Sequence, residues 1–65
     1  PEKTASGTVT GNYVIFHGTS HILLDGRMYT YENDLPNAPM KEGHTYSITY
    51  LQHSKEILQI QEIND

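Results

Sequence analysis

Four histidines are the residues of this 65-residue chain with the widest potential chemistry. His17 and His21 flank a short predicted turn, so their imidazoles could meet across it and begin a metal site. A zinc site needs four ligands, or three and a water, and the chain has no cysteine. The remaining candidate ligands are far apart in the sequence: Asp25, Glu32, His44 and His53. Nothing in the pattern brings them together, so we predict no metal ion and no other cofactor.

Nucleophilic catalysis has little support in the sequence. Serine and histidine are adjacent twice, at Ser20–His21 and His53–Ser54, but neighbouring residues of a strand point to opposite faces. A catalytic triad needs its nucleophile, base and acid to converge on one point. The Gly-Thr-Val-Thr-Gly run at residues 7–11 has no lysine after it, unlike a phosphate-binding loop. We therefore predict that the domain is not an enzyme.

The charge balance argues against binding of double-stranded nucleic acid. Eight Asp and Glu outnumber four Lys and Arg, which gives a net charge of −4. Phosphate binding depends on clustered basic residues, whereas here no two are adjacent. Binding of single-stranded nucleic acid is the least favoured function for the same reason. No stretch approaches the roughly 20 apolar residues of a membrane-spanning helix, so we expect no membrane insertion by this segment.

The length allows one domain with one small core, covering residues 1–65. The chain begins at Pro1 without a methionine, which leads us to expect a piece of a longer protein. Residues 1–5 are polar and predicted to be frayed.

The dipeptide Asp25–Gly26 is the strongest structural signal in the chain. It lies between two apolar runs, and both residues tolerate the positive φ that a two-residue type I′ hairpin turn requires. We therefore predict a hairpin over residues 21–31. Its register sets three cross-strand pairs: Leu24 with Arg27, Leu23 with Met28, and Ile22 with Tyr29.

Three further strands are predicted at residues 6–16, 46–50 and 56–63. Gly11 indicates a bulge or bend in the first, with two separate strands as the alternative. Two prolines argue against a long helix in residues 32–43, and we expect Leu35 and Met40 of this connection to cover one end of the core. In the last strand, Leu58 and Ile60 are expected to face the core, and Ile57 and Ile63 to lie off it.

The sum is an all-β domain of five strands, with its long connection between the third and fourth. This order matches the five-stranded OB-like barrel, and an SH3-like barrel is the alternative.

The register divides the hairpin into two faces. The larger apolar set is predicted to be in the core: Ile22, Leu24, Tyr29 and Tyr31. Inward tyrosines cannot form the stacking platform on which OB-folds bind bases or sugars, and an inverted register would restore it. Leu23 and Met28 are then an opposed apolar pair on the outer face, between His21 and Thr30 and near Tyr13 or Ile15. An adjacent apolar pair of this kind is typical of an interaction patch.

The C-terminal part of the chain, residues 43–60, resembles the closing hairpin of small β-barrel domains from membrane-attached Gram-positive bacterial proteins of unknown function. In those domains the turn reads Tyr-Leu-Pro-His-Ser-Lys. This chain has Gln52 in place of the proline and keeps the other five residues: Tyr50, Leu51, His53, Ser54 and Lys55. The resemblance implies an extracytoplasmic domain excised from a larger protein, and it implies no activity.

The sequence thus predicts a non-catalytic interaction or accessory module. Its candidate patch consists of Leu23, Met28, His21 and Thr30, and its partner is another protein or a second copy of the chain. The alternative is a domain that binds an oligosaccharide or another small ligand.

Overall fold

The computed structural model describes residues 1–16 and 18–63, without the side chains of residues 14–16. The predictions made for His17 and for the side chain of Ile15 therefore lie outside the described residues. Within them the protein is all-β, with no helix. The five strands are β1 (Glu2–Phe16), β2 (Thr19–Leu24), β3 (Arg27–Glu32), β4 (Thr45–Leu51) and β5 (Ile57–Glu62). They form one antiparallel sheet in the order β3-β2-β1-β4-β5.

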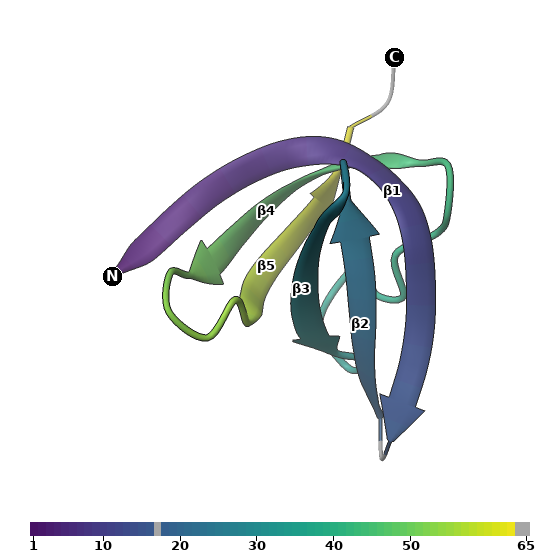
Figure 1. Ribbon diagram of the computed structural model, residues 1–65, viewed down its shortest axis with the longest axis horizontal. Coiled ribbons are helices and arrows are strands. Elements are labelled where there is room, and N and C mark those ends of the chain that lie inside the picture. Colours follow the sequence, from purple (N-terminus) through teal and green to yellow (C-terminus); the bar gives the residue numbers. More distant parts are fainter. Residues whose placement is uncertain (17, 64–65) are drawn as a thin grey trace.

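Strand β1 holds the two hairpins together. Figure 1 shows it as a long arc, with β4 alongside its first half and β2 alongside its second half. The register of β1 against β2 shifts between Val9 and Gly11, so the predicted single strand with an irregularity at Gly11 is confirmed. The predicted fraying of residues 1–5 is wrong, because residues 2–5 pair with residues 48–51 of β4. These side chains are mostly polar and exposed, and the backbone ladder orders them.

The β2–β3 hairpin forms as predicted. Asp25 and Gly26 have φ values of 51° and 83°, and all three predicted cross-strand pairs are present. The four residues assigned to the core are all buried: Ile22, Leu24, Tyr29 and Tyr31.

The β4–β5 hairpin departs from the prediction. Tyr50 lies opposite Ile57 and Thr49 lies opposite Gln59, so Leu58 is an extra residue without a partner. This bulge turns both Ile57 and Ile60 into the core and leaves Leu58 only partly buried. The predicted inward position of Leu58 and outward position of Ile57 are therefore wrong. Ile63 is exposed, as expected.

The sheet is not closed, so a barrel is not confirmed. Its outer strands, β3 and β5, approach each other at one end, where the Thr30 amide donates to the Lys55 carbonyl at 3.0 Å. Thr30 and Glu56 form an isolated parallel bridge at the same place.

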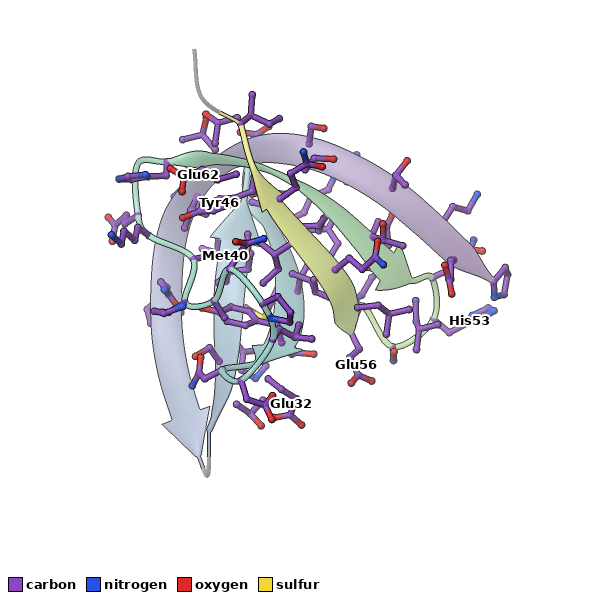
Figure 2. The ribbon with its side chains drawn as sticks, turned by 180° about the vertical axis from the view of Figure 1, so that it is seen from behind. Glu32, Met40, Tyr46, His53, Glu56 and Glu62 are labelled. Atoms are coloured by element: carbon purple, nitrogen blue, oxygen red, sulfur yellow. The ribbon has the colours of Figure 1, made fainter. Side chains whose placement is uncertain are left out.

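The connection between β3 and β4 lies over the core. Met40 is fully buried, and Leu35 packs against the core from its edge, as predicted. Two buried tyrosine hydroxyls accept hydrogen bonds from this connection: that of Tyr31 from the Met40 amide at 3.0 Å, and that of Tyr46 from the Lys41 amide at 2.8 Å. In Figure 2 the connection passes in front of β2 and β3, with Met40 and Tyr46 labelled. The core is thus covered by a segment that side chains tie down rather than by a helix.

Candidate interaction surface

The outer side of β1, β2 and β3 carries two short rows of residues that the pairing places side by side. One row is Tyr13, His21 and Thr30, and the other is Gly11, Leu23 and Met28. Residues opposite one another in a sheet share a face. The structure therefore brings the four predicted patch residues together and adds Tyr13. We call the set of Tyr13, His21, Leu23, Met28 and Thr30 the outer face.

Three apolar side chains dominate the outer face. Met28 is 52% exposed and Tyr13 is 57% exposed, while Leu23 between them is partly buried. Gly11 has no side chain to separate them. A Cβ placed there would lie 3.3 Å from both Leu23 Cδ1 and the Tyr13 hydroxyl oxygen. Tyr13 and Leu23 therefore converge over Gly11, and Leu23 lies directly opposite Met28. The result is a continuous apolar strip across three strands.

A hollow of about 250 Å³ adjoins this strip at the edge of β3. Three of its lining residues belong to the outer face, and the other three are one buried tyrosine and two residues of the β4–β5 turn. The lining consists of His21, Met28, Tyr29, Thr30, Ser54 and Lys55. We call it the Lys55 hollow.

Backbone and ring contacts hold Lys55 in place. Its φ is 62°, its amide donates to the Leu51 carbonyl at 2.9 Å, and its carbonyl accepts the Thr30 amide. The ammonium lies 5.5 Å from the ring centroid of Tyr50, a cation–π contact. That ring in turn packs edge-on against Tyr29, with centroids 4.9 Å apart. The cation is therefore anchored to the aromatic pair that joins the two hairpins.

The Lys55 hollow has a distinct electrostatic character. Its lining residues include one lysine and no acidic residue. Burial raises the pKa of the Tyr29 phenol above its ordinary value of 10.0, and nearby Tyr50 adds to the effect, while Arg27 works against it. His21 Nδ1 is buried without a hydrogen-bond partner. Among the described residues the one contact within salt-bridge distance joins His44 Nδ1 and Glu62 Oε2, at 2.7 Å, and neither residue lines this hollow.

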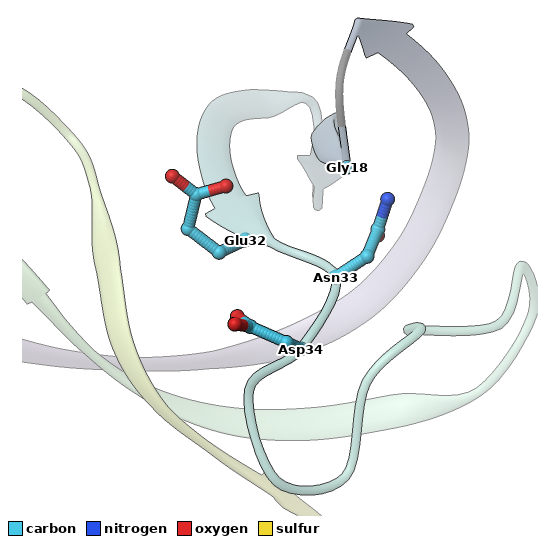
Figure 3. Close-up of a pocket in the computed structure, with 4 residues that line it drawn as sticks. All are labelled: Gly18, Glu32, Asn33 and Asp34. Carbon is cyan, nitrogen blue, oxygen red and sulfur yellow. The ribbon is translucent and has the colours of Figure 1, made fainter.

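A second hollow, of about 350 Å³, is acidic. Figure 3 shows Gly18, Glu32, Asn33 and Asp34 around it. Local partners already engage its polar groups, because Glu32 accepts the Thr19 hydroxyl at 2.9 Å and Asn33 accepts the Ser20 hydroxyl at 2.8 Å. In the part of the chain that the structure describes, no group of three or more His, Cys, Asp and Glu could hold a metal ion.

The described histidines do not converge. His21 lies on the outer face, His44 pairs with Glu62, and His53 is exposed in the β4–β5 turn (Figure 2). Ser20 is buried and points away from its neighbour His21. No described serine and histidine form a nucleophile–base pair by hydrogen bonding.

Sequence reasoning identified the outer face but missed Ser54 and Lys55 as its neighbours. These two residues belong to the β4–β5 turn, for which no contact with the β2–β3 hairpin was predicted from the sequence. No signal of spacing links them to Met28, because the approach of β3 to the β4–β5 turn is a property of the folded sheet.

A comparison with protein-family models, curated proteins and solved structures finds no match to this chain. Among the described residues, no helix is long and apolar enough to span a membrane.

Proposed function

We propose that this domain is a non-catalytic interaction module that binds another protein through the outer face. The observation that carries the proposal is the continuous apolar strip formed by Tyr13, Leu23 and Met28, two of which are more than half exposed. Scattered exposed apolar residues are ordinary, whereas adjacent ones mark interaction sites. Aromatic residues and methionine are also the types enriched in protein interfaces.

The alternative, a domain that binds an oligosaccharide or another small ligand, has less support. Tyr29 and Tyr31 are only 3% and 1% exposed, so neither ring offers a face for stacking. Small-molecule sites are concave, with volumes of about 300 to 1,000 Å³. The Lys55 hollow is smaller than that range, and the apolar strip beside it lies on the open side of a sheet. The acidic hollow of about 350 Å³ falls at the lower end of the range, but Glu32 and Asn33 in it are already hydrogen-bonded to neighbouring hydroxyls.

Closure as an OB-like barrel, rather than an SH3-like one, is part of the proposal. It is supported by the strand order and by the parallel bridge between Thr30 and Glu56, which joins the two outer strands at one end. The resemblance of residues 43–60 suggests an accessory domain outside the membrane. Within this segment Lys55 would then have two roles, because its carbonyl binds the Thr30 amide of β3 and the residue itself borders the outer face.

The proposal is tested by selecting binders from a displayed library of random peptides. Enriched peptides are measured against the wild-type domain and the L23T/M28T variant, and Ile63→Thr serves as the matched control because Ile63 is exposed on a different strand end. We expect L23T/M28T to weaken binding by about thirtyfold or more, the size of an interface hot spot. The control should bind like the wild type.

Amide NMR spectra confirm that all three proteins are folded. Sedimentation equilibrium of the same proteins shows whether a second copy of the chain is the partner. Peptides that bind L23T/M28T as tightly as the wild type, or a failure to enrich any peptide, would overturn the proposal.

A further inference from the structure

The Lys55 hollow and the outer face share three residues, His21, Met28 and Thr30. A protein that covers the outer face therefore also covers the mouth of the hollow. The residues that line the hollow then indicate which chemical groups of that protein would fit at its mouth. This step rests on the proposed function, because it concerns the partner of the same surface.

The size of the hollow suits one side chain. Its volume of about 250 Å³ is below that of pockets that hold drug-sized ligands. Met28 lines the hollow with its half-exposed side chain. Methionine adapts its shape readily to an apolar group. An aliphatic or aromatic side chain that enters here gains apolar contact with Met28.

The charge of the hollow is opposite to that of the chain as a whole. The domain has a net charge of −4, yet the residues that line the hollow include Lys55 and no acidic residue. Within the described residues, no acidic side chain comes within ion-pair distance of Lys55, and the contact recorded for its ammonium is the ring of Tyr50. The cation is thus held against an aromatic ring and has no acidic partner in that part of the chain, and Ser54 and Thr30 line the same hollow as Lys55.

We infer that the partner of the outer face is a peptide segment in which an apolar side chain stands next to a carboxylate. The apolar side chain packs against Met28 in the hollow. The carboxylate accepts a charge-assisted hydrogen bond from Lys55 Nζ, which is shorter and stronger than one between neutral groups. Partners with lysine or arginine at this point are disfavoured by like charge.

Three small probes separate the two parts of the inference. N-acetylphenylalanine has both the ring and the carboxylate, its amide keeps the ring alone, and N-acetylglycine keeps the carboxylate alone. Binding is followed by the methyl NMR signals of the two methionines. Met28 lines the hollow, whereas Met40 is fully buried in the core and serves as an internal control.

We expect N-acetylphenylalanine to shift the Met28 methyl signal and to leave that of Met40 in place. The amide should bind about threefold more weakly, the size expected for an exposed ion pair, and N-acetylglycine should cause no shift. Lys55→Gln should abolish the preference for the carboxylate. Lys41→Gln should retain it, because Lys41 is an exposed lysine that does not line this hollow.

Equal affinity for the acid and the amide, an equal effect of the two lysine substitutions, or no shift of Met28 would overturn the inference. Its failure is distinguishable from failure of the proposed function. Peptides that enrich on the outer face and are lost in L23T/M28T, but carry no carboxylate, would contradict the inference alone.

Discussion

The two hairpins of this domain differ in how firmly their turns set the pairing of the strands. In β2–β3 the strands are joined by Asp25 and Gly26 alone, both in the positive-φ region, and every predicted pair is present. In β4–β5 the strands are joined by residues 52–56, and the pairing shifts by one residue at Leu58. A two-residue turn fixes the register in which its two strands pair. A longer turn allows more than one register, and the packing of side chains in the core then determines which one forms.

In the β4–β5 hairpin, the pairing is the one that buries both Ile57 and Ile60 of β5. With strict alternation, either Ile57 or Ile60 would point outward, because they are an odd number of residues apart. The bulge at Leu58 allows both to be buried and leaves Leu58 partly exposed. Compared with strict alternation that buries Leu58 and Ile60, the β-branched Ile57 replaces Leu58 in the core, and the strand gains one unpaired residue.

The largest effect on stability is expected from truncating Ile57, compared with the same truncation of Leu58. Strict alternation assigns these two residues to the wrong faces of β5. Ile57→Ala should lower the free energy of unfolding by about 3 kcal/mol, because it removes a buried side chain and leaves a cavity. Leu58→Ala should cost about 1 kcal/mol or less, because Leu58 is only partly buried. Urea denaturation followed by tyrosine fluorescence measures both.

A domain of this size is marginally stable, so Ile57→Val is the milder companion to Ile57→Ala and should cost about 1 kcal/mol. A Leu58 truncation that is more destabilising than the Ile57 truncation would restore strict alternation and contradict the bulge.

A middle-sized effect concerns the tip of the first hairpin, which is held by β1 as well as by its own turn. The Asp25 amide donates to the Thr8 carbonyl at 2.9 Å, and the Thr8 amide donates to Asp25 Oδ1 at 3.2 Å. A Cβ at Gly7 would lie 2.4 Å from Asp25 Oδ2 and 2.8 Å from its Cγ. We expect Gly7→Ala to displace this carboxylate and to cost about 1.5 kcal/mol.

A double-mutant cycle shows whether the carboxylate is the cause. Asp25→Gly keeps a residue that accepts positive φ in the turn and removes the obstructing group. In that background Gly7→Ala should cost much less than in the wild type. Ser6→Ala, at an exposed neighbouring position of β1, is the control and should change stability little. An equal cost of Gly7→Ala in both backgrounds would place the strain elsewhere.

The strands and the two faces of the first hairpin could be predicted from the sequence, because period-two alternation and a turn of known geometry are local features. The pairing of residues 2–5 could not be predicted. Their side chains are mostly polar and give no apolar pattern, and they are held in place by backbone pairing with β4. The outer face was predictable since its members alternate with the core. The Lys55 hollow was not, because it joins β3 to a turn about 25 residues later, through an approach of strands that only the folded sheet creates.

The smallest expected effect lies where the two hairpins meet, at the contact between Tyr29 of β3 and Tyr50 of β4. Burial raises the pKa of Tyr29, so the folded protein keeps the phenolic proton at a pH where the unfolded chain has lost it. Above the ordinary value of 10.0 the unfolded state therefore binds fewer protons, and stability falls as the pH rises toward the folded-state pKa.

Urea denaturation between about pH 8 and about pH 11 should show this loss of stability in the wild type and less of it in Tyr29→Phe, which has no phenolic proton to release. Tyr13→Phe, at an exposed ring, should follow the wild type. Parallel curves for Tyr29→Phe and the wild type would mean that the alkaline loss arises outside this contact, and that the two hairpins are not coupled through the ionisation of Tyr29.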